Sequence, residues 1–279
     1  MSTDLIIQGL DIETADLKQL AKISGASAIE QLDNTAFSLR EAWPAPGVAE
    51  LCTERELDHA YVPVDRRLRE FRLLVMDMDS TLITIETIDE LADMVGLKKE
   101  VAAITAQAMR GELEYDESLE RRVALLKDLE ESALERVYEE RLSLTLGAET
   151  LLKRTQSLGI KTLLVSGGFT YMTDKLKSRL KLDHCHSNVL EISGGKLTGK
   201  VLGAIVNADG KREALLKVRD DLGITRNEII GIGDGANDLK FMAECGVSVA
   251  YHAKPVVREK ATHAINYVNL DGVLHLFNQ

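Results

Sequence analysis

The sequence predicts an α/β protein: a doubly wound parallel sheet with an inserted helical segment, preceded by a small α+β domain. Three observations predict this fold class. Short apolar runs that stop at polar residues recur along the chain, as buried parallel strands do. Between residues 86 and 142 the apolar positions instead follow helical spacing. Residues 4–64 follow the strand and helix order of a ferredoxin-like domain.

The N-terminal region reads as six elements in the order βαββαβ. An Asp33-Asn34 turn joins the second strand to the third, because these residues tolerate left-handed backbone geometry. Pro63 and the charged run 65–70 mark the end of this region, so we expect domains at residues 1–67 and 68–279. The expected strands are residues 4–10, 29–32, 36–40 and 59–64, and the expected helices are residues 16–23 and 47–57.

The stretch Phe71–Leu82 is an apolar run, too short for a helix, that stops at two acids. Asp77 and Asp79 would share one face of an extended chain at a spacing of about 6.5 Å. At an effective dielectric near 20 their carboxylates would repel by roughly 2.5 kcal/mol, which a cation would remove. Two solvated aspartates that cap the next helix remain the alternative at this point.

Two further strands end in the same manner. Residues 229–238 end in a glycine-rich turn with Asp234 and Asp238, and residues 163–168 end at Ser166 and two glycines. Strands of a doubly wound sheet bring such ends to one edge, where open α/β sheets bind ligands.

The remaining elements alternate between helix and strand. Residues 86–145 hold four helical stretches, far more than the roughly dozen residues a crossover needs, so they form an inserted cap that could close and exclude water. Gly194-Gly195 predicts a hairpin turn. The other expected elements are helices at residues 147–158, 211–222, 236–244 and 254–260, strands at 160–165, 188–192, 196–202, 228–232, 247–250 and 264–268, and a last element at 271–277.

With these motifs in this order the chain resembles the haloacid dehalogenase superfamily of phosphoryl-transfer enzymes. The resemblance implies that Asp77 is a nucleophile that forms an aspartyl-phosphate and that Asp79 is the general acid and base. It also implies a Mg²⁺ cofactor held by Asp77, the backbone carbonyl of Asp79, and Asp234.

The resemblance further implies a set of substrate contacts. Ser166 and the Gly167 amide match the phosphate-binding motif, and Lys211 matches the lysine that neutralises phosphate, with its neighbour Arg212 as the alternative. Asn237 would touch substrate, and Asp238 would orient the water shell of the metal.

The cap is expected to set specificity. Glu86 would pair with a substrate ammonium and Arg122 would grip a carboxylate through its planar fork, which favours a small zwitterionic monoester such as phosphoserine. Arg121 is a confounder for Arg122, and Met109 or Tyr115 would line the apolar side. Phosphohomoserine, phosphothreonine or a phosphotransferase reaction remain alternatives.

Composition excludes several partners. A formal net charge of −11 and a pI near 5.1 argue against nucleic acid and polyanionic membranes. No segment reaches the roughly 20 apolar residues of a membrane span and no signal peptide is visible, so we expect a cytoplasmic protein. Cys52, Cys185 and Cys245 read as reduced thiols, and His184-Cys185-His186 as an ordinary surface turn.

Three other functions have partial support. Gly231-Ile-Gly233-Asp-Gly-Ala236 satisfies a loose dinucleotide fingerprint, but Asp234 would lie where the pyrophosphate binds. A nucleophilic Ser166 would need glycine at position 164, which is Leu. The N-terminal region resembles small amino-acid-binding, ACT-like regulatory domains, so it could be a serine sensor, a scaffold or a module for a homodimer.

Overall fold

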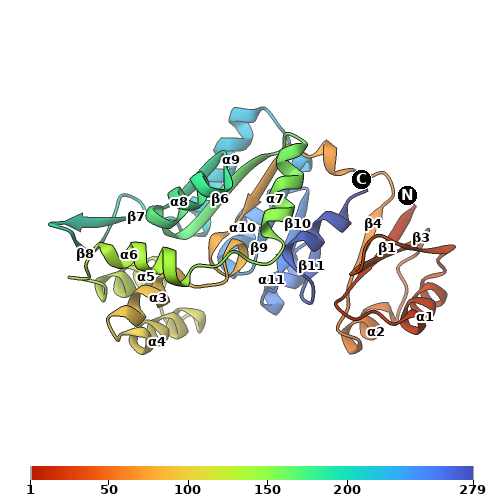
Figure 1. Ribbon diagram of the computed structural model, residues 1–279, viewed down its shortest axis with the longest axis horizontal. Coiled ribbons are helices and arrows are strands. Elements are labelled where there is room, and N and C mark those ends of the chain that lie inside the picture. The colour runs from red at the N-terminus through yellow and green to blue at the C-terminus, as the bar shows by residue number, and fades with distance from the viewer. Residues whose placement is uncertain (1, 279) are drawn as a thin grey trace. The chain divides into compact units, whose positions relative to one another are not determined.

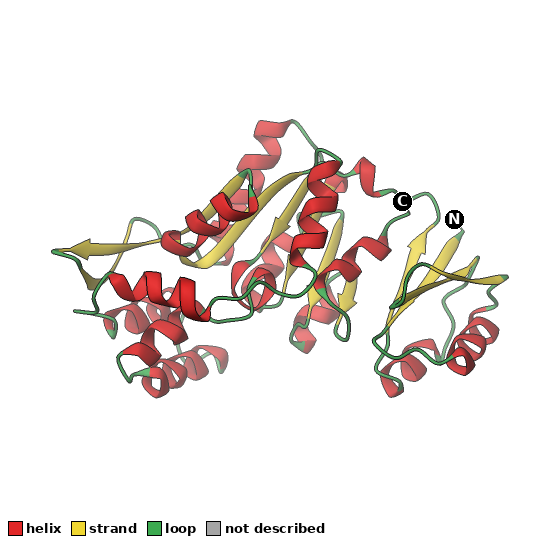
Figure 2. Ribbon diagram, viewed as in Figure 1, coloured by secondary structure: helices red, strands yellow, loops and turns green. Residues whose placement is uncertain are grey.

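The computed structural model describes residues 2–278 (Figure 1). The chain forms two compact units. The first holds the region up to Leu74, residues 146–161 and the region from Ile224 onward, and the second holds residues 75–145 and 162–223. Helices and strands alternate along both, as the colouring of Figure 2 shows.

The N-terminal region folds as a four-stranded antiparallel sheet with two helices. Its strand order, β2-β3-β1-β4, is the ferredoxin-like arrangement. Leu5 and Leu39 pair across β1 and β3, and their side chains join Leu20 and Leu51 of the helices in one core. The predicted elements are confirmed as β1 (Thr3–Gln8), α1 (Thr14–Ser24), β2 (Ala28–Gln31), β3 (Ala36–Arg40), α2 (Val48–Glu54) and β4 (Asp58–Pro63).

The second sheet has seven strands in the order β11-β10-β9-β5-β6-β7-β8. Parallel pairs join β6 to β7, β9 to β10 and β10 to β11, whereas the hairpin strand β8 runs antiparallel to β7. The order grows in both directions from β5, so the sheet is doubly wound with its switch point beside β5. The strands are β5 (Leu73–Met76), β6 (Lys161–Phe169), β7 (His184–Ser193), β8 (Lys196–Leu202), β9 (Ile229–Gly233), β10 (Val247–Tyr251) and β11 (His263–Ile265).

Helices connect these strands, and their ends follow local sequence signals. Asn207 caps the N-terminus of α9 with its side chain, and Gly223 ends the same helix at a φ of 63°. Pro255 opens α11, where its missing N–H costs no hydrogen bond. The helices are α7 (Ala148–Ser157), α8 (Thr170–Leu180), α9 (Ala208–Leu222), α10 (Leu239–Met242) and α11 (Pro255–Lys260), and a 3₁₀ segment spans Leu270–Leu276.

The inserted helical region, residues 84–143, is called the cap below. It contains α3 (Thr87–Met94), α4 (Lys98–Met109), α5 (Tyr115–Ala124) and α6 (Ser132–Arg136). The chain enters and leaves the cap side by side: Ile83 and Leu144 form an antiparallel bridge, and the Thr84 amide donates to the Ser143 carbonyl at 3.0 Å. We call this pair of segments, residues 82–84 and 143–145, the neck.

Polar contacts fasten the N-terminal sheet to the chain after β11, within the first unit. The buried carboxylate of Asp58, on β4, accepts from the amides of Asn266, Tyr267 and Val268 at 2.7, 2.9 and 3.3 Å. It also accepts from Asn266 Nδ2 at 3.2 Å. Every donor is a neutral N–H group. Burial raises the pKa of Asp58, and these hydrogen bonds, which favour the charged carboxylate, act in the opposite direction.

Several sequence predictions need correction. The strand expected at residues 160–165 does not stop at Ser166 but continues to Phe169, with a shift of register against β7 after Val165. The strand expected within Phe71–Leu82 ends at Met76, so both acids follow it in a turn. The surface turn expected at His184-Cys185-His186 is wrong, because these residues begin β7 and pair with Leu163, Leu164 and Val165 of β6. Their side chains keep exposed surface, which lets a polar triplet occupy a strand.

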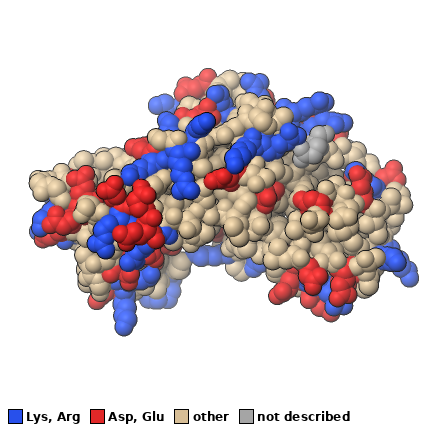
Figure 3. Space-filling view, in the orientation of Figure 1, with Lys and Arg blue, Asp and Glu red and all other residues tan. Residues whose placement is uncertain are grey.

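The surface mixes both signs of charge. On the face drawn in Figure 3, Lys and Arg lie among Asp and Glu. Among residues 2–278, no helix is long and apolar enough to cross a bilayer.

Candidate active site

Asp77, directly after β5, forms a buried ion pair with Lys211. The Lys211 ammonium lies 2.7 Å from Asp77 Oδ1, and the lysine is completely buried. A buried ammonium is costly unless it is paired and hydrogen-bonded, so this contact explains why the lysine can lie there. Of the two predicted candidates it is Lys211, in the first turn of α9, that contacts Asp77.

Asp79 lies in the turn after Asp77 and holds the start of α3. Its Oδ1 accepts from the Thr87 amide at 3.0 Å and from the Thr87 hydroxyl. Burial and then the negative charge of Glu86 raise the pKa of Asp79 to about 7, although the Thr87 hydrogen bonds act in the opposite direction. A carboxyl group with such a pKa can both donate and accept a proton near neutral pH.

The turn Met78–Leu82 carries backbone strain. Ser80 has a φ of 55°, a left-handed conformation that residues other than glycine rarely adopt. Its amide donates to the Ile85 carbonyl at 3.3 Å, and its hydroxyl donates to Glu86 Oε1 at 2.7 Å. The strained turn therefore orients the exposed carboxylate of Glu86 at the entrance of the cap.

Residues 166–168 lie near the end of β6, where its pairing with β7 is irregular between Val165 and Phe169, and we call this polar segment the β6 loop. Ser166 is buried, and its hydroxyl accepts from the Gly168 amide at 2.8 Å. A Cβ atom on Gly168 would lie 2.8 Å from the methyl of Met78 and 2.9 Å from Asp79 Oδ2. Glycine is thus required for this loop to approach the turn that carries Asp79.

The cap contributes the first turn of α5. A Cβ atom on Gly167 would lie 2.1 Å from the hydroxyl oxygen of Tyr115, so the phenol packs directly on the loop. Arg122, two turns further along α5, is half-buried and donates to the Ser118 carbonyl at 3.2 Å. Arg121 instead pairs with Glu117 on the exposed side of the helix, which separates it from Arg122.

The turn after β9 is held by contacts among its own residues. Asp238 is fully buried, and its Oδ2 accepts from the Gly235 amide at 3.0 Å. A Cβ atom on Gly233 would lie 2.6 Å from that oxygen. The glycine at position 233, which satisfied a dinucleotide fingerprint, is therefore explained by the close approach of Asp238. Asn237 lies in the same turn with its amide oxygen close to Gly235.

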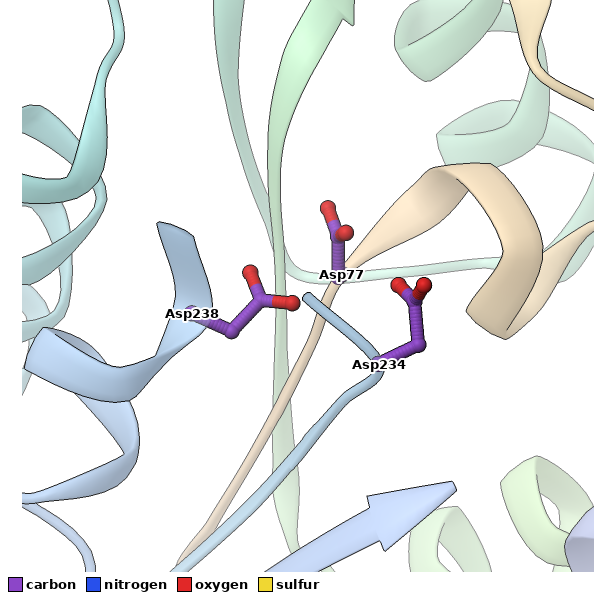
Figure 4. Close-up of side chains that lie close together, drawn as sticks. All are labelled: Asp77, Asp234 and Asp238. Atoms are coloured by element: carbon purple, nitrogen blue, oxygen red, sulfur yellow. The ribbon is translucent and has the colours of Figure 1, made fainter. Parts of the chain in front are cut away.

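Three carboxylates gather around one point. One oxygen each of Asp77, Asp234 and Asp238 lies within 4.8 Å of the others. Figure 4 shows the three side chains close together. Hard oxygen ligands in such a group suit a small divalent cation, and without one they repel each other. The group includes Asp238, which was predicted only to orient the water shell of the metal. It does not include the side chain of Asp79, because the predicted ligand atom of that residue is its backbone carbonyl oxygen.

Sequence reasoning missed several supporting residues. Asn188 donates to the Gly167 carbonyl and accepts from the Val206 amide, both at 2.8 Å, so it ties the loop to the segment before α9. Thr87 and the contact of Asn207 with Asp116 were also missed. The signal for Asn207 was present, because Asn directly before a helix predicts an N-cap.

Comparisons with known proteins identify the family of the chain. A family model described as haloacid dehalogenase-like hydrolase matches residues 71–246, and a domain of unknown function (DUF4072) matches residues 5–47. A phosphoserine phosphatase of Polaromonas sp. (strain JS666 / ATCC BAA-500) is 51% identical over 217 residues, which cover 76% of this chain and 92% of the relative.

Solved structures give the same answer. The unliganded crystal structure of a probable phosphoserine phosphatase from Vibrio cholerae matches with a TM-score of 0.85 at 36% identity, over 99% of this chain and 86% of that chain. A phospho-aspartyl intermediate analogue of phosphoserine phosphatase matches with a TM-score of 0.70 at 38% identity, over 75% and 99%. The chain therefore belongs to the haloacid dehalogenase-like hydrolase family. It is an enzyme, a phosphatase in class.

Proposed function

We propose that this protein hydrolyses O-phospho-L-serine to L-serine and phosphate, with Mg²⁺ and through an aspartyl-phosphate on Asp77. The observation that carries the proposal is the buried Asp77, directly after the strand at the switch point, with the Lys211 ammonium 2.7 Å from its Oδ1. The named activity of the relatives supports the substrate, and the phospho-aspartyl analogue among the matched structures supports the intermediate.

Hydrolysis of a phosphate monoester needs several devices at once. Enzymes accelerate such reactions by up to about 10²¹, on the order of 28 kcal/mol, whereas acid and base catalysis gives about 10²–10⁴. In our proposal Asp77 attacks phosphorus, the seryl oxygen leaves, and water later hydrolyses the aspartyl-phosphate. Lys211 neutralises charge on the phosphoryl group, and Ser166 and the Gly167 amide donate to its oxygens.

Asp79 would transfer the proton in both steps. It would protonate the leaving seryl oxygen and then take a proton from the attacking water. Its placement against Gly168 supports this role, because the carboxyl Oδ2 lies beside residues 166–168, the segment proposed to bind phosphate. The Thr87 hydrogen bonds hold the other oxygen, which fixes the direction of the carboxyl group.

The donor set fits Mg²⁺. Asp77, the Asp79 carbonyl and Asp234 would hold the ion, with Asp238 beside them, and all are the hard oxygen ligands that Mg²⁺ prefers. When bound, the ion supplies positive charge at the phosphoryl oxygens. Asn237, in the turn between the two aspartates, would contact substrate.

Charges of the cap would recognise the amino acid. Glu86, oriented by Ser80, would pair with the ammonium group, and Arg122 would bind the carboxylate through its planar fork. A simple aryl phosphate carries neither the ammonium nor the carboxylate group. Its turnover can therefore be compared with that of phosphoserine to test both contacts.

The test is phosphate release from phosphoserine, phosphothreonine, phosphohomoserine and p-nitrophenyl phosphate, with Mg²⁺ and with EDTA. We expect phosphoserine to have the highest kcat/KM and EDTA to abolish turnover. Arg122→Ala should lower kcat/KM for phosphoserine by about 100-fold or more and leave p-nitrophenyl phosphate much less affected. Arg121→Ala is the matched control and should change neither. Equal losses on both substrates would refute the clamp, and a preference for another ester would refute phosphoserine.

A further inference from the structure

The side chain of Asn207 uses both of its ends. Its Oδ1 accepts from the amides of Asp209 and Gly210 at 3.0 and 3.1 Å and so caps α9. Its Nδ2 donates to Asp116 Oδ1 at 2.9 Å and Oδ2 at 3.2 Å. The orientation of the amide is fixed twice over, because one end faces donors and the other faces a carboxylate.

The helix that Asn207 caps carries the lysine of the active site. The Lys211 amide donates to the Asn207 carbonyl at 2.9 Å, so the two residues bound the first turn of α9. From that turn the Lys211 side chain reaches Asp77. A change in the direction of the first turn would therefore move the ammonium relative to the nucleophile.

Asp116 belongs to the cap, not to the sheet domain. It is exposed and lies in the first turn of α5, beside Tyr115, whose hydroxyl packs on Gly167. Adjacent residues of one helical turn thus touch both polar elements of the active site: the β6 loop and the start of α9. Both contacts can form only while this end of the cap lies against them.

We propose that Asp116 is a positioning residue that links the placement of the cap to the placement of Lys211 through Asn207. When the cap closes, the carboxylate of Asp116 grips the capping amide and holds the first turn of α9, so that the ammonium stays aligned with Asp77. The proposal deepens the phosphatase reaction proposed above and depends on hydrolysis of a phosphate monoester, not on which ester is preferred.

The critical variant is Asn207→Asp. Aspartate caps helices as well as asparagine does, so α9 keeps its cap, but the Nδ2 donor becomes an oxygen that faces the Asp116 carboxylate. We expect kcat/KM to fall about 10-fold, the effect of losing one charge-assisted hydrogen bond and gaining a repulsion. The melting temperature should change by less than about 2 °C, because the cap of the helix survives.

The rescue variant is the exchange Asp116→Asn with Asn207→Asp. The amide donor and the carboxylate acceptor then change places, so the hydrogen bond forms again and kcat/KM should return to within about 3-fold of wild type. Asp116→Asn alone keeps an acceptor for Asn207 and should lose only about 2–3-fold. Lys217→Gln, an exposed change elsewhere on α9 with the same alteration in charge, is the control and should have no effect.

Two readouts separate positioning from a structural role. Hydrogen exchange of the first-turn amides of α9 should stay at the wild-type rate in Asn207→Asp and in the exchange variant, because the cap of the helix persists, so a loss of kcat/KM there is not a loss of helix structure. Each variant is assayed with phosphoserine and p-nitrophenyl phosphate. If the wild-type enzyme does not hydrolyse phosphoserine, the substrate proposal is refuted, and the link between Asp116 and Lys211 is still tested with the aryl ester. Wild-type kcat/KM in Asn207→Asp, or a loss that the exchange does not restore, would overturn the link.

Discussion

Two buried aspartates, in different regions of the molecule, are stabilised in opposite ways. Asp58, on the edge strand β4, is surrounded by three backbone amides and one side-chain amide, all neutral donors. Asp77, after β5, faces an ammonium on one side and gathers with two further carboxylates. The neutral donors around Asp58 fix a conformation, whereas the three carboxylates near Asp77 repel each other, a cost that a cation would offset.

The comparison teaches that burial alone does not mark a catalytic carboxylate. Asp58 is as deeply buried as Asp77, at 3% and 5% exposure, yet its partners are the neutral amide groups of residues 266–268. Asp77 differs because other charged groups lie close to it. It follows β5, the strand from which the order of the sheet grows in both directions. The predictions below test this difference.

The largest effect is expected at Asp77. Asp77→Asn removes the attacking oxygen and should lower phosphate release by about 10⁴-fold or more, because the covalent step depends on that atom. Steady-state kinetics measures the loss, and circular dichroism checks that the fold persists. Turnover near the wild-type rate would exclude Asp77 as the nucleophile and remove the contrast with Asp58.

Asp58→Asn should do the reverse. The new amide turns two hydrogens toward N–H donors, so we expect the free energy of unfolding to fall by about 3 kcal/mol. At 25 °C kcat should stay within about 2-fold of wild type, because Asp58 contacts nothing in the proposed active site. Urea unfolding and kinetics measure both quantities, with the exposed Asp65→Asn as control. A large loss of kcat without a loss of stability would contradict this assignment.

The contact of Tyr115 with Gly167 gives a third test of what the active site requires. Gly167→Ala places a Cβ atom 2.1 Å from the phenol oxygen, so the Tyr115 side chain must shift, with or without the cap that carries it, and we expect kcat/KM to fall about 100-fold. In a Tyr115→Phe background the nearest ring atom lies at 3.4 Å, an ordinary contact, so most activity should return. Tyr115→Phe alone is the control. If the double variant stays as slow as Gly167→Ala, the phenol is not the obstacle.

The smallest effect concerns a buried base. His263 Nε2 accepts from Arg66 at 3.1 Å while Nδ1 donates to the Thr262 hydroxyl at 2.8 Å, so the neutral ring is the form that fits. Burial, with the nearby Arg66 charge, lowers the pKa of His263 to about 3. The unfolded pKa is about 6.5, so this stability is complete above that pH and is lost as pH falls from 6.5 toward 3.

The corresponding measurement is urea unfolding at pH 7.5 and 5.5. At pH 5.5, one unit below the pKa of the ring in the unfolded chain, keeping His263 neutral should lower the free energy of unfolding of the wild type by about 1.4 kcal/mol. His263→Gln should lack that part of the pH dependence, whereas the exposed His186→Gln should keep it. An unchanged slope in His263→Gln would show that the ring is already protonated in the folded protein.

Local patterns predicted more of the fold than of the site. The six N-terminal elements and the strands β5, β6 and β9 follow from periodicity and turn residues, although β5 stops at Met76 and β6 continues past Ser166 to Phe169. The boundary at residues 67 and 68 and the roles of the site residues stay predictions. Lys211 could be named only from the resemblance, because its partner Asp77 lies 134 residues away.

Contacts between distant segments explain what local patterns could not give. Asn188 touches Gly167 across 21 residues and Asn207 touches Asp116 across 91, and neither pair has a signature within its own segment. The strand at His184–His186 was missed for the same reason, since its pairing with β6 outweighs the polar character of the triplet.

The neck has a consequence for the modularity of the enzyme. Because the two segments of the neck are hydrogen-bonded neighbours, residues 84–143 begin and end at nearly one place. A different helical insert whose own ends meet at that spacing could replace them while β5 and the turn after it keep their places. The cap could therefore be exchanged as a whole, and with it Glu86 and Arg122, the residues that we propose to recognise the amino acid.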